Sequence, residues 1–287
     1  MSGIGNWRQQ AEKDLGSRLT RLDRVGGGDF ADSYSAVLES GARVFVKTHS
    51  SPPPNHFSTE ATGLRWLHDA AAVPVPAVLG VSDDPPFLAI EWIEEGHGND
   101  QTEVNFGAAL ASLHKNSGSC FGREDKRSTG SLGLPNEPCA DWATFYGSQR
   151  LLPLVRIAQD RGALPDDCLR RIDKLAAILP ELADNNEPAA RLHGDLWAGN
   201  RLIDENGVSW LIDPAAHGGH REFDLAMMRL FGGFGDAAFR AYHEKYPLAP
   251  GWEERVLLHQ LAPLIVHAIK FGGHYVGSTV KAVKTYC

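Results

Sequence analysis

In the first third of the chain, short hydrophobic runs alternate with turns that contain glycine. The runs favour strands and the glycines favour tight connections, which together predict an antiparallel sheet. Hydrophobic positions at helical spacing predict a short helix over residues 4–16 and a second helix that begins at Phe57 and includes Glu60. The predicted strands cover residues 18–25, 32–38, 42–49, 76–82 and 86–93.

The pattern changes after residue 93. The run EEGHGND at 94–100 is polar and contains glycine, which is typical of a linker between lobes. Beyond it, hydrophobic residues recur at helical spacing. The predicted helices cover residues 102–116, 141–159, 165–184, 222–246 and 252–271. We therefore expect an α+β fold with two lobes: a small antiparallel-sheet lobe with one main helix over residues 1–93, and a larger, mostly helical lobe over 94–287.

Composition narrows the class of protein. The 287 residues are 43% hydrophobic and carry a formal net charge of −8, which disfavours extended contact with nucleic-acid phosphates. The four cysteines are widely spaced and lack a CxxC pair, so we expect reduced thiols and no zinc site. The N-terminus lacks an apolar signal-peptide core, and no later stretch approaches the roughly 20 apolar residues of a membrane helix. These features predict a cytoplasmic protein without nucleic-acid or membrane partners.

Two features of the predicted sheet are typical of nucleotide binding. The segment GGGDFADS, with Gly26, Gly27 and Gly28, lies between two strands, where backbone N–H groups can face phosphate oxygens. Lys47 lies in the apolar strand RVFVKTHS and needs a partner for its charge, which Glu60 on the following helix can supply. Each feature also has a simpler interpretation: a glycine-rich turn, and a snorkelling lysine with a solvated glutamate.

A second group of polar residues lies in the helical lobe. In HGDLWAGN, Asp195 and Asn200 are five positions apart, the spacing of the Asp and Asn in the kinase catalytic loop. Asp195 would accept the proton of the substrate hydroxyl, while Asn200 and Asp213, which ends the run WLID, would bind Mg²⁺ at the nucleotide phosphates. His193 can shape the loop through backbone hydrogen bonds. Taken singly, Asp and Asn in loops more often cap helices or close turns.

The order of these residues is more informative than any one of them. A glycine loop, a strand lysine, a helix glutamate, D-x-x-x-x-N and a strand-end aspartate follow one another as in kinases. This order predicts a protein-kinase-like fold and phosphoryl transfer from ATP with Mg²⁺ as the metal. The nucleotide is then expected at the connection between the lobes, where Glu91, Trp92 and Ile93 would contact adenine.

The stretch HGDLWAGN, followed by LIDPAAHGGHREFDLAMMRLFGGF, resembles the fructosamine kinase (ketosamine 3-kinase) family, a branch of the aminoglycoside phosphotransferase and choline kinase group. The resemblance runs from roughly residue 18 to near the C-terminus. It implies ATP- and Mg²⁺-dependent phosphorylation of the C3 hydroxyl of a ketosamine, of the ribulosamine, erythrulosamine or fructosamine type, in protein deglycation repair. The expected partner is a small-molecule or protein-bound ketosamine, and the expected assembly is a monomer or weak dimer.

Four residues near the two catalytic carboxylates are candidates for contact with the sugar: Trp197, His217, His220 and Arg221. Asp224, at the start of the next predicted helix, is expected to be a helix-start or loop-bracing carboxylate rather than a metal ligand. Many members of the family carry a cysteine directly after the glycines, where this chain has Asp29. We expect the Asp29 side chain to point away from the phosphates, because it would repel them.

Two alternatives stay open. A different phosphotransferase of the same fold would act on an aminoglycoside, choline or another hydroxyl acceptor, because function belongs to the site rather than to the fold. A nucleotide-binding pseudokinase would serve as a scaffold, and the presence of all five polar residues of the motif argues against it. Those residues are Lys47, Glu60, Asp195, Asn200 and Asp213.

Overall fold

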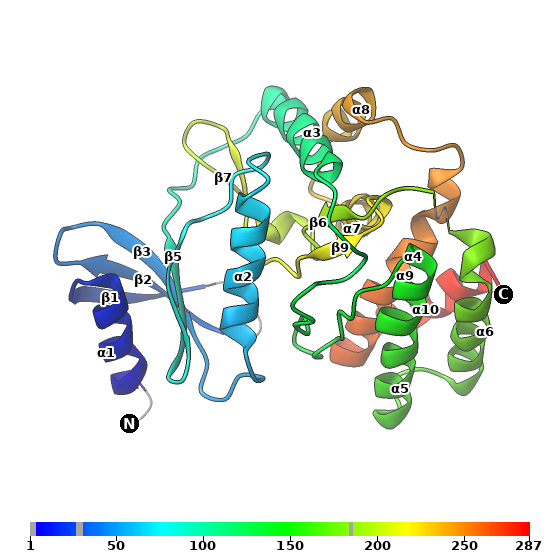
Figure 1. Cartoon of the computed structure of the whole chain (residues 1–287), viewed down its shortest axis with the longest axis horizontal. Helices are drawn as coiled ribbons and strands as arrows, with labels where there is room; N and C mark the ends of the chain where they lie inside the picture. Colours follow the sequence, from blue (N-terminus) through cyan, green and yellow to red (C-terminus); the bar gives the residue numbers. More distant parts are fainter. Residues whose placement is uncertain (1–3, 27–30, 184–185) are drawn as a thin grey trace.

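The computed structural model describes residues 4–26, 31–183 and 186–287. Its N-terminal part is built on a five-stranded antiparallel sheet with the strand order β1-β2-β3-β5-β4 (Figure 1). The strands are β1 (Leu19–Val25), β2 (Asp32–Leu38), β3 (Arg43–Thr48), β4 (Val78–Asp83) and β5 (Pro86–Glu91). The antiparallel sheet predicted from the hydrophobic runs is confirmed.

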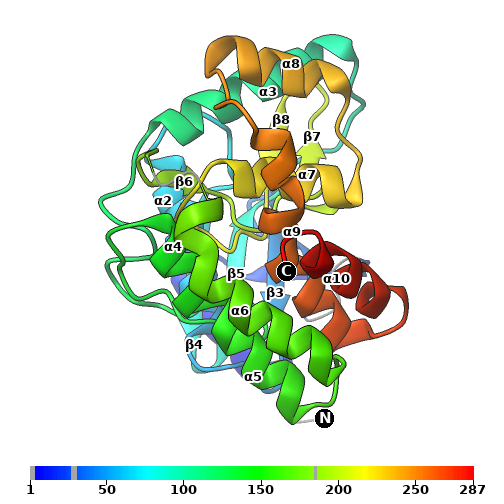
Figure 2. The ribbon, with the colours of Figure 1, turned by 90° about the vertical axis from the view of Figure 1, so that its right-hand side faces the viewer.

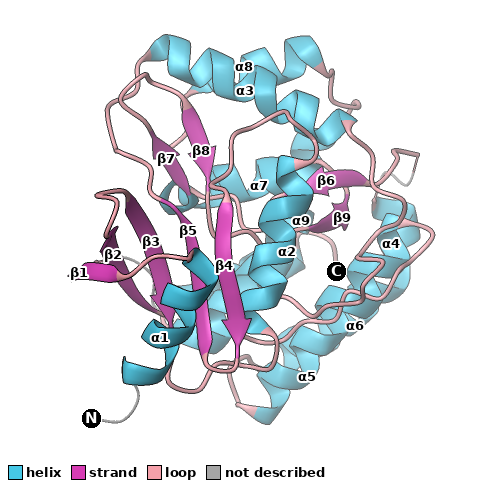
Figure 3. Ribbon diagram, turned by 60° about the vertical axis from the view of Figure 1, so that its left-hand side comes forward, coloured by secondary structure: helices cyan, strands magenta, loops and turns pink. Residues whose placement is uncertain are grey.

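Two helices cover the two faces of this sheet, and Figure 3 shows the first of them in front of it. α1 (Ile4–Leu15) packs Trp7 against the face that carries Val46, and α2 (His56–His68) packs against the opposite face. Side chains alternate across a strand, so Lys47, next to Val46, points toward α2. The alternation of β3 thus places one charged residue on the face covered by α2.

The remainder of the chain is mostly helical, as predicted, and Figure 2 looks onto this part. Its helices are α3 (Asp100–Lys115), α4 (Trp142–Phe145), α5 (Leu152–Asp160), α6 (Asp166–Leu182), α7 (Glu222–Phe231), α8 (Asp236–Lys245), α9 (Trp252–Phe271) and α10 (His274–Lys284). Two short ribbons hold the loops between α6 and α7: β6 (Ala190–Leu192) pairs with β9 (His217–Gly219), and β7 (Arg201–Ile203) with β8 (Ser209–Leu211). The division into lobes between residues 93 and 94 stays a prediction.

Three features of the helical part differ from the prediction. The run 222–246 forms two helices, because Gly232 and Gly233 take φ values of 71° and 85° that end α7. The run 141–159 is interrupted by a π-helical turn at Tyr146–Leu151 between α4 and α5. The C-terminal helix α10 has no counterpart among the predicted elements.

The connection after β5 is fixed to the helical part. Gly96 donates its N–H to the carbonyl of Ile203 at 2.8 Å, and a Cβ at position 96 would lie 2.5 Å from the carbonyl oxygen of Asp204. Asn99 caps α3 by accepting the N–H of Thr102 at 3.1 Å. The predicted linker is therefore a segment with fixed contacts, which limits how the sheet can move relative to the helices.

The most extensive hydrophobic core lies in the helical part, around the buried and stacked rings of Trp142 and Tyr146, whose centroids are 5.0 Å apart. All four cysteines are free thiols, as their spacing predicted. Among the described residues, no helix is both long and apolar enough to cross a membrane.

Gly107 of α3 is a packing point that leaves no room for a larger residue. A Cβ there would lie 2.0 Å from the carbonyl oxygen of Ala238 on α8, so backbone must move to accept it. We expect Gly107→Ala to lower the free energy of unfolding by about 1–3 kcal/mol. Gly277 of α10 is the matched control, because a Cβ there meets nothing within 4 Å, and Gly277→Ala should raise stability by about 0.5–1 kcal/mol. Urea unfolding measures both changes, and equal stability of the two variants would contradict this packing.

Candidate active site

A buried ion cluster joins the sheet, α2 and the turn after β8. The Lys47 side chain is 8% exposed, and its Nζ lies 2.8 Å from Oε1 of Glu60 on α2, which is the contact predicted from the sequence. The same Nζ also donates to Oδ1 of Asp213. Burial alone lowers the pKa of a lysine, but the Glu60 and Asp213 carboxylates outweigh it and raise the pKa of Lys47. Lys47 is therefore a charged ammonium held between two acidic side chains.

Asp213 reaches this cluster from a strained turn. It has a φ of 55°, a left-handed conformation that costs a non-glycine residue roughly 1–2 kcal/mol, although Asp tolerates it better than most residues. The N–H of Ile212 donates to the carbonyl of Asn200 at 3.0 Å, so the two predicted metal ligands lie on adjoining backbone segments. The turn directs the Asp213 carboxylate toward Lys47, and the Asp213 side chain is 35% exposed. Strain of this kind is typical of functional sites.

The loop that carries Asp195 is held in place by Asp224 of α7. The buried Asp224 carboxylate accepts the N–H of His193 at 2.7 Å and that of Gly194 at 2.9 Å. Nε2 of His193 donates to the carbonyl of Ile212 at 2.8 Å, which ties the loop to the turn of the ion cluster. Gly194 has a φ of 80°, and a Cβ there would lie 2.2 Å from a backbone carbonyl oxygen. The expectations that His193 shapes the loop and that Asp224 braces it are confirmed.

Asp195 combines a partly buried carboxyl group with an amide partner. Nδ2 of Asn200 donates to the carbonyl oxygen of Asp195 at 2.9 Å and to its Oδ2 at 3.2 Å. Burial raises the pKa of Asp195 to about 7, against the hydrogen bond from Asn200, and the negative charge of Asp213 adds to the rise. A carboxyl group with this pKa can take up and release a proton near neutral pH, as general acid–base chemistry requires.

Asn200 and Asp213 offer ligand atoms that fit a magnesium ion. Because Nδ2 of Asn200 is bonded to Asp195, the amide oxygen is the atom left for a metal. The partly exposed Asp213 carboxylate comes from the adjoining backbone segment. Mg²⁺ prefers hard oxygen ligands and is usually bound by one or two carboxylates together with substrate phosphates. This donor set suits Mg²⁺ better than a metal that favours nitrogen or sulfur.

The glycine-rich connection between β1 and β2 is described only at its two ends. Gly26 directly follows β1, while Gly27, Gly28 and Asp29 lie outside the described residues. The role of these glycines as a phosphate cradle and the outward direction of Asp29 therefore stay predictions.

The residues predicted to contact adenine follow one another at the end of β5. The N–H of Glu91 donates to the carbonyl of Ala77 at 2.9 Å, and its carboxylate accepts the N–H of Ala77 at 3.2 Å. The Trp92 ring lies under the guanidinium of Arg43, which is 3.9 Å from the ring centroid, and Ile93 is buried. An adenine here would use backbone groups other than the N–H of Glu91. The contact itself stays a prediction.

Three of the four candidates for sugar contact lie inside the helical part. His217, His220 and Arg221 are at most 2% exposed. His217 donates from Nδ1 to the carbonyl of Ala215 at 2.8 Å, and Arg221 donates from Nε to Glu187 at 2.6 Å. All three side chains are enclosed by protein in this structure, and their contact with the sugar stays a prediction. The segment turns inward as β9 and the start of α7, which its position in the sequence does not reveal.

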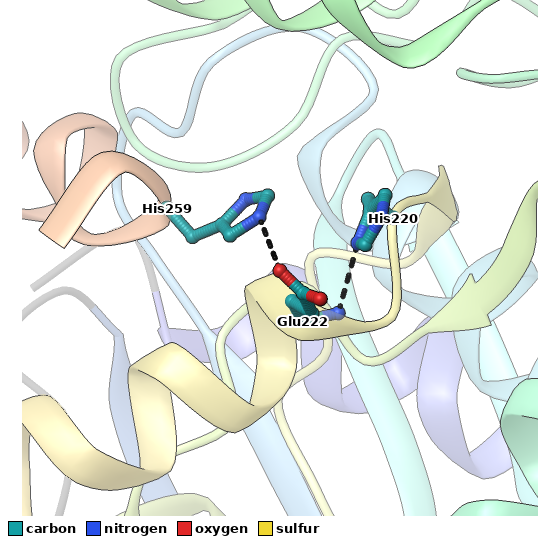
Figure 4. Close-up of side chains that lie close together, drawn as sticks. All are labelled: His220, Glu222 and His259. Carbon is teal, nitrogen blue, oxygen red and sulfur yellow. Dashed lines mark hydrogen bonds and ion pairs between the residues drawn. The ribbon is translucent and has the colours of Figure 1, made fainter. Parts of the chain in front are cut away.

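His220 belongs to a buried cluster with Glu222 and His259 (Figure 4). Their potential ligand atoms lie within 4.8 Å of one another, as in a metal site. The two imidazole rings are stacked, however, with centroids 5.1 Å and planes 25° apart, so their in-plane lone pairs do not converge on one point. The Arg255 guanidinium also donates hydrogen bonds to both carboxylate oxygens of Glu222, with N···O distances of 2.6 and 2.8 Å. The cluster is therefore a charged brace between α7 and α9 rather than a metal site.

Buried imidazoles predict a loss of stability in mild acid. Burial lowers the pKa of His217 and of His220 to about 3, whereas histidine in an unfolded chain titrates near pH 6.5. Below that pH the unfolded state binds more protons than the folded state, which lowers the free energy of unfolding by about 1 kcal/mol per histidine at about pH 5.5. Urea unfolding at about pH 7.5 and about pH 5.5 measures this loss. His220→Asn should reduce the loss, and replacing the exposed His97 should not. The raised pKa of Asp195 stabilises the folded state over the same pH range, so the contribution of His220 is the difference between the wild-type protein and His220→Asn. An equal pH dependence of stability in these two proteins would contradict a neutral, buried His220.

An aromatic surface borders the catalytic loop. The exposed Trp197 contacts Phe231, with ring centroids 6.2 Å apart, and Phe231 contacts His267 at 4.7 Å. His267 in turn contacts Tyr275 at 4.9 Å and the exposed Phe271 at 5.5 Å. Only Trp197 was among the candidates from the sequence. The spacing of four residues between His267, Phe271 and Tyr275 is the signal that could have found these three, and no comparable signal marks Phe231.

The lysine of the sheet with the glutamate of α2, the D-x-x-x-x-N loop and the aspartate after β8 together define a phosphotransferase of the protein-kinase-like class. A choline kinase of Streptococcus pneumoniae has this fold: its structure matches with a TM-score of 0.67 at 14% identity, over 97% of this chain and 96% of that one. At this identity the match shows the fold alone, and it confirms the predicted fold class.

Within this class, the chain belongs to the fructosamine kinase family, whose sequence profile matches residues 5–287. The crystal structure of a candidate fructosamine-3-kinase from Thermobifida fusca matches with a TM-score of 0.91 at 38% identity, over 99% of both chains. The chain is also 31% identical over 278 residues to the chloroplastic protein-ribulosamine 3-kinase of Arabidopsis thaliana, covering 94% of this chain and 83% of that protein. The family resemblance of the sequence is confirmed.

Proposed function

We propose that this protein transfers the γ-phosphoryl group of ATP to the C3 hydroxyl of a ketosamine. The observation that carries the proposal is the ion cluster of the buried Lys47 and Glu60 with the partly exposed Asp213, together with the hydrogen-bonded pair of Asp195 and Asn200. Phosphoryl transfer needs these groups together, because its catalysis consists mainly of positioning and charge stabilisation. The names of the Arabidopsis and Thermobifida relatives describe 3-kinases of amine-linked ketoses, which supports the acceptor and the position of transfer.

The residues of the site would have different roles in binding the nucleotide. Lys47 would bind phosphate oxygens, and Glu60 would keep its ammonium in place while the phosphates take over part of the contact now made by Asp213. Asn200 and Asp213 would hold Mg²⁺, which neutralises phosphate charge when bound. Asn200 has a second task, because its amide nitrogen orients the carboxylate of Asp195.

Asp195 would act on the acceptor. It would take the proton of the C3 hydroxyl as the oxygen of that group bonds to phosphorus, and its pKa of about 7 suits proton transfer near neutral pH. Lys270 lies close enough for its positive charge to favour the carboxylate form of Asp195.

The aromatic surface beside Asp195 gives the acceptor a place to bind. Trp197 and Phe271 expose large hydrophobic side chains, and Phe231 and His267 connect them. Aromatic rings can pack against the apolar C–H groups of a sugar derivative while the hydroxyl groups of the sugar stay hydrated. We infer that the ketosamine lies on this surface with its C3 hydroxyl toward Asp195.

A panel of acceptors tests the proposed function. ATP consumption is measured with purified protein, Mg²⁺ and each of four acceptors: ribuloselysine, fructoselysine, choline and an aminoglycoside. We expect consumption with at least one of the two ketosamines and none with choline or the aminoglycoside. Consumption with choline or the aminoglycoside alone would remove the proposed acceptor class. The monomer or weak dimer, the cytoplasmic location and the choice between free and protein-bound acceptors stay predictions.

A further inference from the structure

Two arginines of the helical part contact α2 on either side of Glu60. Nη2 of Arg123 donates to Oγ1 of Thr62 at 2.8 Å, and Nη1 of Arg127 donates to Oγ of Ser58 at 2.8 Å. The two hydroxyl residues are four positions apart, so they lie one turn apart on neighbouring positions of the helix surface. The arginines therefore fix the turn of α2 that contains Glu60.

Asp125 joins the two arginines into one unit. It accepts Nε and Nη2 of Arg123 at 2.8 and 2.9 Å and lies 3.3 Å from Nε of Arg127, whose backbone N–H it also accepts at 3.2 Å. The Arg123 side chain is only 11% exposed, and its bonds to Thr62 and Ala216 are partly buried, whereas the Asp125 side chain is 40% exposed. We name the set of Arg123, Asp125 and Arg127 the arginine clasp.

The arginine clasp is also attached to the segment that follows Asp213. Nη1 of Arg123 donates to the carbonyl of Ala216 at 3.4 Å. The residue before Arg123 is Gly122, which pairs with Gly218 of β9 through two backbone hydrogen bonds of 2.8 Å. One guanidinium thus contacts both α2 and the segment behind the Asp213 turn.

We propose that the arginine clasp positions α2 so that Glu60 holds Lys47 in the geometry required for phosphate binding. Asn55 at the N-terminal end of the helix makes no side-chain cap, and the Asp83 carboxylate accepts the N–H of Ser58 at 3.2 Å instead, so the two arginines add to the side-chain contacts that hold this end of α2. In kinases, the contact between the strand lysine and the helix glutamate must be in place for activity, and the position of the helix controls it. Arg123 and Arg127 are positioning residues, since they contact the helix rather than the reacting atoms. The inference rests on the proposed function, because it assigns Lys47 and Glu60 to ATP.

Removing the clasp should loosen the lysine contact without removing it. We expect Arg123→Ala to raise the dissociation constant for Mg·ATP about 10-fold and to lower kcat up to about 100-fold, because a displacement of about 1 Å at a reacting group can have an effect of this size. Arg123→Lys should recover only part of the loss, since a lysine lacks the fork that reaches Thr62 and Ala216 together. Arg170→Ala is the matched control, because Arg170 also pairs with an aspartate but is 66% exposed on α6.

A double-mutant cycle with Glu60→Gln separates positioning from general stability. If the clasp acts through Glu60, Arg123→Ala should change Mg·ATP binding and kcat by no more than about twofold in the Glu60→Gln background, because the two changes remove the same contact. Full additivity, or wild-type values in Arg123→Ala alone, would overturn the inference. Thr62→Val, which removes the bond from Arg123 to α2 together with the Thr62 bond to the carbonyl of Thr59, serves the same cycle if Arg123→Ala does not fold. Calorimetry of Mg·ATP binding needs no acceptor, so a wild-type protein that binds ATP but phosphorylates no ketosamine speaks against the proposed function and leaves the clasp testable.

Discussion

Asp195→Asn is expected to lower kcat for ketosamine phosphorylation about 10²- to 10⁴-fold while the affinity for ATP stays nearly unchanged. The amide cannot take a proton from the acceptor hydroxyl. Its oxygen can still accept the bond that Asn200 now donates to the carboxylate, so the loop should keep its shape. Initial rates at saturating ketosamine, together with calorimetric titration of ATP, measure the two effects separately.

The control for this variant is the same substitution at an aspartate outside the catalytic loop. Asp173 is exposed on α6, and Asp173→Asn should leave both kcat and ATP affinity at wild-type values. A wild-type rate in Asp195→Asn would remove Asp195 from proton transfer. A wild-type protein that binds ATP and phosphorylates none of the acceptors would instead favour the scaffold alternative.

Lys47→Met should have the second large effect, on both catalysis and stability. We expect kcat/KM for ATP to fall about 10²- to 10³-fold, as it does when one preorganised donor to a developing charge is lost. The free energy of unfolding should fall by about 3 kcal/mol, because the change leaves the buried Glu60 carboxylate without its cation. Steady-state kinetics with varied ATP and urea unfolding measure these losses.

The double variant Lys47→Met/Glu60→Gln separates the two consequences. Replacing Glu60 removes the uncompensated buried charge, so the double variant should regain most of the lost stability. Its kcat/KM for ATP should stay as low as in Lys47→Met, because the cation is still missing. Recovery of kcat/KM in the double variant would contradict the role of Lys47 at the phosphates.

The sequence predicts those parts of the site whose partners follow from local geometry. A lysine in an apolar strand needs a partner, and the next helix offers Glu60, so their contact could be inferred before the structure was known. The contact between Lys47 and Asp213 joins residues 166 positions apart. The order of the kinase-like motif predicted that both residues belong to one site, which the periodicity of hydrophobic residues could not predict. Their direct contact was not predicted.

Other features depend on contacts that the sequence does not reveal. Arg221 was predicted to contact the sugar because it follows the catalytic carboxylates, and the sequence did not predict that it is buried and paired with Glu187, 34 positions away. The aromatic surface is assembled from Trp197 of the catalytic loop and from α7, α9 and α10, and the last of these helices was not predicted. The arginine clasp likewise lies in a loop without helical or strand periodicity. Each of these features is set by tertiary packing, which overrides local preference.

The most direct test of the central claim is the product formed from ketosamine, ATP and Mg²⁺. Ribuloselysine and fructoselysine are each incubated with the wild-type protein and with Asp195→Asn, and the products are analysed by mass spectrometry and by phosphorus–carbon NMR couplings. We predict that the wild-type protein adds one phosphoryl group to the C3 oxygen of at least one ketosamine and that the variant adds almost none. Unchanged ketosamines, or a phosphoryl group on another oxygen, would contradict the assignment.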